Sequence, residues 1–390
     1  MQDNEKKPAL RFKGFTDPWE QRKLGEIAFF SKGVGYSKND LCEEGTPIIL
    51  YGRLYTKYET CIFDVDTFVK EKAGSVYSKG GEVIVPASGE TAEDISIASV
   101  VVKPGILLGG DLNVVSPTAE YDSAFLALTI SSGATHKYLS SLAQGKSVVH
   151  LHNADIQSVS AKFPTKREQE KIHLLFGKID TLITLHQRKY EKLVNIKKSM
   201  LDKMFPQNGA SVPEIRFKGF TDPWEQRKLG DLCVEFRSGE FISASDITET
   251  GEYPVFGGNG LRGFTDRFNH DGEYTLIGRQ GALCGNVNFA VGKSYFTEHA
   301  IAVRADKKNQ TRFLYYLFST MDLGQYSGQS AQPGLAVGNL VELKSTLPDK
   351  QEQEKISGVL TALDTLITLH QRKLEKLQNI KKSCLEKMFV

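Results

Sequence analysis

A long, apolar-striped segment occurs twice in this chain of 390 residues, and it constrains the fold more than any other feature. Residues 168–205 and 352–389 are identical at 27 of 38 positions. In both copies apolar residues recur at spacings of three, four and seven, which is typical of a helix with one apolar face. Neither copy contains a proline. Each is therefore predicted to form one helix about 57 Å long, at roughly 1.5 Å per residue.

A helix of this length cannot bury its apolar stripe alone, and the second copy supplies a partner within the same chain. We therefore predict that the two helices pack on each other as a coiled coil. The same polar run, His-Gln-Arg-Lys, interrupts both stripes at 186–189 and 370–373, and it serves either register control or contact with a partner. The residues expected to pair the helices are Ile172, Ile179, Leu182, Leu193, Ile196, Ile356, Leu363, Leu366, Leu377 and Ile380.

A second duplication precedes the first. Residues 11–27 return as 216–232 with two substitutions. Asp17 and Asp222, each followed by a proline, predict the N-cap of a short helix in both copies. The chain is thus predicted to contain six segments, namely a repeat segment (1–27), a first domain (28–165), a central long helix (166–205), a second repeat segment (206–232), a second domain (233–349) and a C-terminal long helix (350–390).

The two domains between the duplicated segments share little sequence with each other. Each mixes short strand-like runs, such as 81–88 in the first and 272–279 in the second, with a helical stretch at 123–142 or 311–321. This mixture predicts the α+β class for both domains. A constant frame around divergent contents indicates two related tasks carried out on different targets.

Charge is distributed unevenly along the chain, although the formal net charge is only +2. Lys and Arg outnumber Asp and Glu by ten to five at 166–203 and by eight to five at 350–390. Acidic residues prevail by fifteen to eleven at 28–165 and by thirteen to ten at 233–349. The helices are basic and the domains mildly acidic, so overall charge does not by itself indicate nucleic-acid binding.

The N-terminal residues are charged and lack the apolar run of a signal peptide. No stretch approaches the roughly 18 apolar residues of a membrane span. We therefore expect a cytoplasmic protein without membrane contact. The five cysteines form no CxxC pair and no cluster with histidine, which predicts reduced thiols and no metal site.

No reactive constellation can be assembled from the sequence. The run from Gly258 to Gly263 matches the glycine pattern of dinucleotide-binding loops, but a strand and turn pattern follows it where a helix is required. His150 and His152 share one face of a predicted strand without further metal ligands nearby. The chain is therefore predicted to be non-catalytic, with no metal and no cofactor of its own.

Loops suited to contact with DNA bases are easier to identify. Glycine occurs there beside Arg, Asn and Gln, whose side chains hydrogen-bond base edges in the major groove. The same composition is typical of ordinary surface turns, so both interpretations stay open on composition alone. The candidate DNA-binding residues are Tyr51, Arg53, Ser88, Glu90, Thr91, Lys146, Ser147, His150, His152, Asn259, Arg262, Arg279, Gln280, Asn286, Gln329, Ser330 and Gln332.

The order of these segments resembles the specificity (S) subunit of type I restriction-modification enzymes. The resemblance covers nearly the whole chain. It rests on the two WEQRKLG segments, the two helices that contain LDTLITLHQRK or its close copy, GRQGALCGN at 278–286, and GQSAQPGLAVGNL at 328–340. It implies an α+β protein in which two target recognition domains are joined by two long antiparallel coiled-coil helices, as a pseudo-twofold internal repeat.

The resemblance also implies a function. Each recognition domain would read one half of a split target in double-stranded DNA, and the helices would set the spacer between the halves. The helices would also dock two methyltransferase (M) subunits, which bring S-adenosylmethionine. Restriction (R) subunits, which use ATP and magnesium, would complete the complex, so the chain would be a non-catalytic part of a restriction and adenine methyltransferase enzyme.

A second interpretation keeps the architecture and changes the ligands. The chain would then be a tandem adaptor whose domains bind proteins or glycans, and whose helices serve only as a spacer. The mild acidity of the domains is compatible with it. Copurification of an adenine methyltransferase would favour the first interpretation, and its absence would favour the adaptor.

Overall fold

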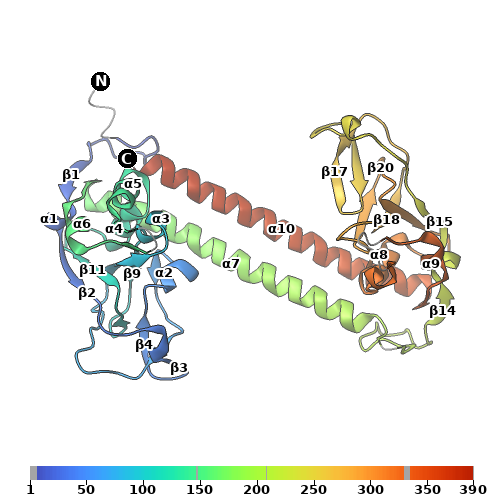
Figure 1. The fold of residues 1–390 in the computed structure, drawn as a ribbon, viewed down its shortest axis with the longest axis horizontal. Coiled ribbons are helices and arrows are strands. Elements are labelled where there is room, and N and C mark those ends of the chain that lie inside the picture. The colour runs from blue at the N-terminus through green and yellow to red at the C-terminus, as the bar shows by residue number, and fades with distance from the viewer. Residues whose placement is uncertain (1–6, 146–147, 208, 329–333, 390) are drawn as a thin grey trace. The chain divides into compact units, whose positions relative to one another are not determined.

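The computed structural model describes residues 7–145, 148–207, 209–328 and 334–389. The chain forms two compact units, a first unit of residues 1–186 and 372–390 and a second unit of residues 187–371. Each unit contains one of the two domains, one repeat segment and part of both long helices (Figure 1). Each of the two domains is therefore built together with both helices.

Two helices of 39 residues, α7 (Lys166–Met204) and α10 (Lys350–Met388), confirm the prediction of two long helices. In the first unit, the start of α7 lies against the end of α10, where Asp180 and Lys381 form an ion pair of 2.6 Å. In the second unit, the end of α7 lies against the start of α10, where Lys197 and Asp364 pair at 2.5 Å. The pairing is therefore antiparallel within each unit, as expected.

The seam between the helices includes seven of the ten residues predicted to pair them. Along α7 the buried and half-buried positions alternate at spacings of four and three, at 172, 176, 179, 183, 186 and 190. Ile172, Ile179 and Ile356 are buried as predicted. Half-buried positions include the remaining predicted residues Leu193, Ile196, Leu363 and Leu377.

Three residues predicted to pair the helices do not lie in this seam. Leu182, Leu366 and Ile380 are 43%, 42% and 40% exposed. The prediction was wrong for Leu182 and Leu366 because the next residue in each case is also apolar, and an isoleucine at 183 or 367 takes the seam position. The histidine of each polar run occupies a seam position too, and His370 is only 6% exposed.

A five-stranded sheet of order β2-β11-β7-β9-β5 forms the centre of the first domain, and a four-stranded sheet of order β10-β4-β6-β3 accompanies it. Every residue of β7 is buried, because α4 packs on one face of β7 and β9 and the apolar cluster around Ile84 covers the other face. The strands are β2 (Ala28–Lys32), β3 (Leu41–Cys42), β4 (Thr46–Ile49), β5 (Cys61–Ile62), β6 (Phe68–Val69), β7 (Glu82–Pro86), β8 (Ser88–Gly89), β9 (Ser99–Val101), β10 (Leu107–Leu108), β11 (Leu112–Pro117) and β12 (Val149–His150). The helices are α2 (Arg53–Thr56), α3 (Ala92–Ile95), α4 (Ser123–Ile130), α5 (Gly133–Leu142) and α6 (Asn153–Ser158).

The second domain has a four-stranded antiparallel sheet of order β15-β21-β18-β19 and a three-stranded sheet of order β17-β16-β20. Helix α8 packs on β18, β19 and β21. The strands are β15 (Cys233–Ser238), β16 (Tyr253–Gly257), β17 (Gly260–Thr265), β18 (Glu273–Gly278), β19 (Val287–Val291), β20 (Tyr295–Phe296) and β21 (Ala300–Ala305). The helices are α8 (Thr311–Ser319), α9 (Val337–Glu342) and the 3-10 turns η4 (Ala244–Asp246) and η5 (Leu323–Tyr326). Both domains confirm the predicted α+β class.

The same aromatic arrangement joins the duplicated segments to each domain. In the first unit, Trp19 lies edge-on to Phe125 of α4 at 5.7 Å, and Phe389, directly after α10, stacks on Phe125 at 5.4 Å. In the second unit, Trp224 and Phe205 make the corresponding contacts with Phe313 of α8, at 6.0 and 5.4 Å. The duplicated segments therefore complete the core of each domain.

The short capped helix predicted at each repeat segment was wrong. Residues after Pro18 form β1 (Glu20–Lys23), which pairs antiparallel with β13 (Ser160–Phe163). The second copy does the same with β14 (Glu225–Lys228) and β22 (Lys344–Leu347). A single turn follows each strand, α1 (Leu24–Ile27) and the 3-10 turn η3 (Leu229–Leu232). The local capping signal was overridden because long-range strand pairing satisfies the same backbone groups.

None of the helices in the described ranges combines the length and apolarity needed to cross a bilayer.

Candidate nucleic-acid interface

The first unit contains a cleft of about 1280 Å³ between the first domain and the last turns of α10. Its walls include α2, β8, the region of α3 and the turn between β10 and β11. It gathers the sequence candidates Tyr51, Arg53, Ser88 and Glu90. Lining residues that the sequence did not single out are Tyr36, Tyr55, Lys57, Tyr58, Asp94, Asp111 and Lys381.

Three tyrosines of this cleft lie on or beside α2. Tyr51 and Tyr55 pack edge to face with ring centroids 6.1 Å apart, and the Tyr55 hydroxyl donates to the carbonyl of Ser88 at 2.6 Å. Burial raises the pKa of Tyr55 well above its ordinary value, so it stays a neutral donor. The spacing of 51, 55 and 58, which is four and then three residues, was the sequence signal that could have identified them.

Arg53 is better explained as part of the scaffold than as a reader of bases. Its side chain is buried, and its guanidinium donates to Asp66 at 3.0 Å and to Glu59 at 2.6 Å. The Asp64 carbonyl accepts a third hydrogen bond at 3.1 Å. An arginine with its donors committed in this way cannot also make the bidentate contact that guanine requires. The geometry therefore favours a scaffold role for Arg53.

Carboxylates line the same cleft. Glu90, Asp94 and Asp111 are exposed there, and a carboxylate accepts a hydrogen bond from the amino group of cytosine. Asp111 has φ of 56°, the only positive φ at a non-glycine among the described residues. Such conformations cluster at functional sites. The cleft also contains Lys57 and Lys381, so its lining offers both acceptors and donors to base edges.

The other candidates of the first domain have varied roles. Thr91 caps α3 by accepting a hydrogen bond from the Asp94 amide at 3.1 Å. His150 and His152 are exposed, with parallel rings 6.4 Å apart, and Ser88 Oγ lies 3.4 Å from His150 Nδ1. Within the described ranges, no group of three His, Cys, Asp or Glu side chains is placed to hold a metal ion. Lys146 and Ser147 lie outside the described residues.

In the second unit, several loops meet at the ends of β16, β18 and β20. The backbone amide of Arg279 donates to the His299 carbonyl at 2.9 Å, and Leu335 donates to the Arg279 carbonyl at 2.9 Å. A Cβ at Gly278 would lie 2.4 Å from the carbonyl oxygen of Gly258, so this close approach requires glycine. We call these loops, residues 257–262, 278–286, 297–299 and 334–335, the loop cluster.

The loop cluster gathers the sequence candidates of the second domain. Asn259, Arg262, Gln280 and Asn286 are exposed on it, and Arg279 is half-buried. The candidates Gln329, Ser330 and Gln332 lie outside the described residues. Two further residues, Glu298 and His299, join the cluster, where His299 Nδ1 lies 3.0 Å from Gln280 Oε1. No pattern in the sequence distinguished them, because a lone Glu-His pair before a strand is common surface chemistry.

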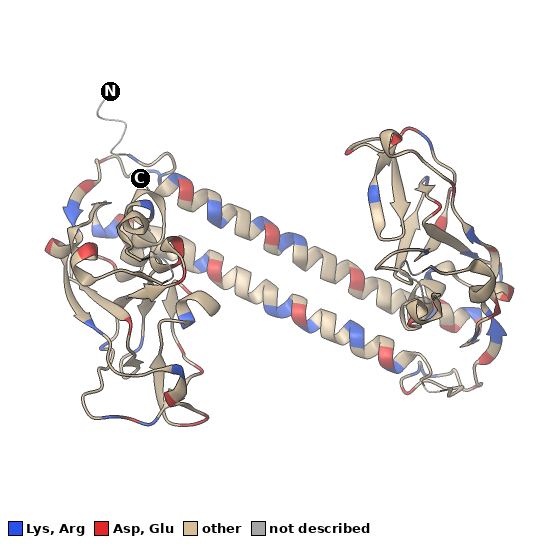
Figure 2. Cartoon of the chain, in the orientation of Figure 1, with Lys and Arg blue, Asp and Glu red and all other residues tan. Residues whose placement is uncertain are grey.

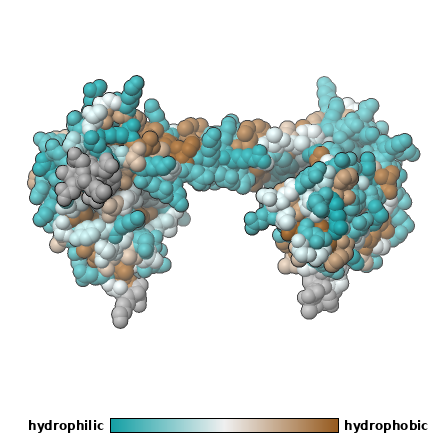
Figure 3. All heavy atoms as spheres, turned by 90° about the horizontal axis from the view of Figure 1, so that it is seen from above, coloured by the Kyte–Doolittle hydropathy of each residue, from teal (hydrophilic) through white to brown (hydrophobic). Residues whose placement is uncertain are grey.

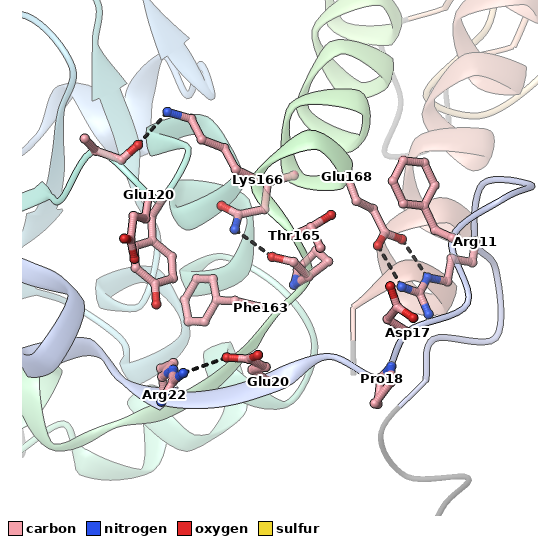
Figure 4. A pocket seen from close by; sticks show the side chains of 15 residues that line it. Arg11, Asp17, Pro18, Glu20, Arg22, Glu120, Phe163, Thr165, Lys166 and Glu168 are labelled. Carbon is pink, nitrogen blue, oxygen red and sulfur yellow. Dashed lines mark hydrogen bonds and ion pairs between the residues drawn. The ribbon is translucent and has the colours of Figure 1, made fainter.

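A second cavity, of about 620 Å³, lies where the first repeat segment meets the start of α7 (Figure 4). Arg11 forms a two-pronged ion pair with the buried Glu168 at 2.7 and 2.8 Å. Arg216 and Glu352 repeat this pair in the second unit, at 2.8 Å for both contacts. The pair anchors each repeat segment to a long helix.

The model of the family described as type I restriction modification DNA specificity domain matches residues 16–195 and 221–379. The specificity subunit of the type I restriction enzyme EcoprrI from Escherichia coli is 42% identical over 174 residues, which cover 44% of this chain and 42% of that protein. The MjaVIII specificity subunit from Methanocaldococcus jannaschii is 21% identical over 399 residues, which cover 94% of this chain and 91% of that protein.

Among solved structures, the S subunit of a type I restriction-modification system from M. genitalium matches with a TM-score of 0.73. The match covers 98% of this chain and 99% of that one at 16% identity, so it shows a shared fold. The family match falls on both units and on both long helices. The chain therefore belongs to the family of type I restriction modification DNA specificity domains.

Proposed function

We propose that this chain is the DNA-specificity subunit of a type I restriction-modification system, and that each domain reads one half of a split target in double-stranded DNA. The observation that carries the proposal is the duplicated frame. Both units join a repeat segment, the end of one long helix and one domain helix through the same aromatic arrangement. The surfaces proposed to contact DNA differ, since the first unit has the cleft and the second unit has the loop cluster. Family membership supports the same conclusion.

Two copies of a methyltransferase (M) subunit are the proposed protein partners. Exposed side chains contribute little to folding stability. Yet the exposed Asp17 and Glu20 of the first repeat segment recur as the exposed Asp222 and Glu225 of the second. Identity at exposed positions in both units supports a shared partner that docks once on each unit.

Apolar side chains on the surface of the long helices support the same docking (Figure 3). Leu182 and Leu185 are 43% and 58% exposed, and their equivalents Leu366 and Leu369 are 42% and 45% exposed. Exposed apolar patches often mark protein interfaces. Lys and Arg recur along the same helices (Figure 2), so an apolar surface bordered by acidic residues would complement them.

The chemistry of the complex would reside in the partners. The M subunits would bring S-adenosylmethionine and methylate adenine, and R subunits with ATP and magnesium would join to cleave DNA. This chain would make no covalent change. It would choose the sequence and hold the partners in place.

The long helices would act as the ruler between the two half-sites. Readers on one side of a duplex lie about one helical turn apart, roughly 34 Å, or a multiple of it. A helix of 39 residues is about 58 Å long at roughly 1.5 Å per residue. A helix of this length is therefore sufficient to separate two readers by such a distance.

Copurification and DNA binding test the proposal together. The tagged full chain, expressed in its host, is expected to copurify with an adenine methyltransferase, and the complex should methylate a split sequence. The chain alone should bind DNA weakly and lose binding as salt rises, because its domains are mildly acidic and phosphate contacts would come from the partners. Tight, salt-resistant, sequence-specific binding by the chain alone would contradict this division of labour.

The adaptor interpretation predicts the opposite copurification. A protein or glycan ligand would be recovered and no methyltransferase. None of the relatives found by comparison supports it.

A further inference from the structure

Gln280 lies in a part of the loop cluster that the backbone holds firmly. The residue before it, Arg279, is hydrogen-bonded through its amide to His299 and through its carbonyl to Leu335, each at 2.9 Å. Gln280 itself forms an isolated bridge with Gly334. The carbonyl of Gly258 approaches Gly278 so closely that a Cβ there would lie 2.4 Å from it. The Gln280 backbone therefore needs no side-chain bond to keep its position.

The Gln280 side chain is nevertheless held in one orientation. Gln280 Oε1 lies 3.0 Å from His299 Nδ1, and His299 Nε2 lies 3.3 Å from Glu298 Oε1. An amide oxygen only accepts hydrogen bonds, so Nδ1 is the donor of this contact. In the protonated imidazole, Nε2 faces the Glu298 carboxylate as a donor while Nδ1 donates to the amide oxygen, and this state fixes which end of the amide points away from His299.

The amide nitrogen of Gln280 is left to face outward. Gln280 is exposed, and no hydrogen bond from its Nε2 is formed to any residue that the structure describes. A glutamine amide matches adenine in the major groove, because Nε2 donates to N7 while the remaining lone pair of Oε1 accepts from the N6 amino group. Reading groups are most selective when neighbouring hydrogen bonds hold them in place.

A purely structural role does not account well for the hydrogen bond between Gln280 and His299. A hydrogen bond between two partly exposed side chains contributes little to folding stability. The backbone bonds already order this loop. Three further exposed polar candidates, Asn259, Arg262 and Asn286, lie on the same loop cluster. The Gln280 side chain is therefore placed as a group that contacts a base, with His299 holding its amide in one orientation.

We propose that Gln280 reads an adenine in the half-site of the second domain, and that His299, held by Glu298, is the positioning residue that orients its amide. This inference rests on the proposed function and assigns one residue within it. It also explains why a histidine and a glutamate, rather than small residues, follow β20.

The test uses the full chain in complex with its M subunits and maps methylated adenines across a genome. Wild type should require an adenine at one position of the second half-site. Gln280→Ala should accept other bases there, with discrimination reduced about 10-fold or more, in line with about 1–3 kcal/mol for a bidentate contact. His299→Ala should relax the same position, because the amide can then rotate. The first half-site should stay unchanged in both variants.

A conservative variant separates orientation from folding. His299→Asn keeps an N–H donor close to the place of Nδ1 and should retain the wild-type sequence, whereas His299→Ala should not. Thermal unfolding should be similar for all three variants. An unchanged recognition sequence in Gln280→Ala would overturn the reading role, and relaxation in His299→Asn equal to that in His299→Ala would overturn the positioning role. If wild type methylated no split sequence at all, the proposed function would fail instead.

Discussion

Equivalent positions in the two units hold their domain helices by different chemistry. In the first unit, His173 of α7 lies 3.0 Å from the carboxylate of Asp122, which caps α4. In the second unit, the equivalent Ser357 of α10 donates to Gln310, which precedes α8. A titrating pair in one unit corresponds to a neutral pair in the other. A change of pH should therefore alter the stability of the two units unequally.

The direction of the pH effect follows from both partners. The hydrogen bond to Asp122 raises the pKa of His173, with burial opposing it. Burial alone would raise the pKa of Asp122, but hydrogen bonds from His173 and the Phe125 amide hold it below its ordinary value. The His173 contribution is therefore complete below the ordinary histidine pKa and is lost as pH rises through the raised pKa. The Asp122 contribution is lost only as pH falls through its lowered pKa.

His173→Ala is accordingly expected to destabilise the first unit by about 1 kcal/mol at pH 6 and by much less at pH 9. Thermal unfolding of the full chain at both pH values measures this. Ser357→Ala is the matched control, because it removes a neutral hydrogen bond and should shift unfolding similarly at both pH values. An equal loss in His173→Ala at pH 6 and pH 9 would contradict the pairing with Asp122.

At the scale of elements, the two cross-helix ion pairs are copies of each other. Asp180 and Lys197 of α7 correspond to Asp364 and Lys381 of α10, and each aspartate pairs with the lysine of the other helix. The aspartates also contact the domains, since Thr60 donates to Asp180 at 3.2 Å and the Tyr316 hydroxyl donates to Asp364 at 2.7 Å. Each pair therefore links both helices to one domain.

Charge reversal tests the pair in the first unit. Lys381→Asp should lower the unfolding temperature, because it places two carboxylates together. The double variant Asp180→Lys with Lys381→Asp should recover part of the loss, up to about 1 kcal/mol for such a partly exposed pair. The Thr60 contact with Asp180 is lost in the double variant, so recovery is expected to be incomplete. No recovery at all would show that the pair contributes nothing.

The sequence predicted the elements better than it predicted their contacts. Duplicated apolar periodicity was enough for α7 and α10, because a strong stripe of this length has few alternatives. The sequence could not show whether Leu182 or the isoleucine that follows it faces the other helix, because both are apolar. The strand β1 could not be predicted either, because its partner β13 lies 140 residues away in the chain.

In the candidate site, too, the sequence predicted residue types better than it predicted their contacts. Composition selected Gln280 and Asn259 because glycine-rich loops with amide side chains have a recognisable pattern. It also selected Arg53, whose carboxylate partners come from residues 59–66 and could not be distinguished from other acidic residues. His299 was missed because its role depends on a loop from another part of the domain.

At the scale of the whole molecule, the proposed ruler makes a prediction about spacing. Insertion of one helical turn, about four residues, into α7 is expected to change the length of the spacer between the half-sites and to leave both half-sites unchanged. Methylation mapping of the variant complex measures both quantities. A matched control inserts the same residues into the segment between α7 and β14. If the spacer stayed the same with the α7 insertion, the helices would not be the ruler.

Domain-by-domain reading is the central claim, and exchange of residues 233–349 for the second domain of another family member tests it most directly. Adenine methylation is mapped in complexes of the wild-type chain and the exchanged chain with the same M subunits. Domain-by-domain reading predicts a new sequence in one half of the target, with the other half and the spacer as in wild type. A change in both halves, or in neither, would contradict it.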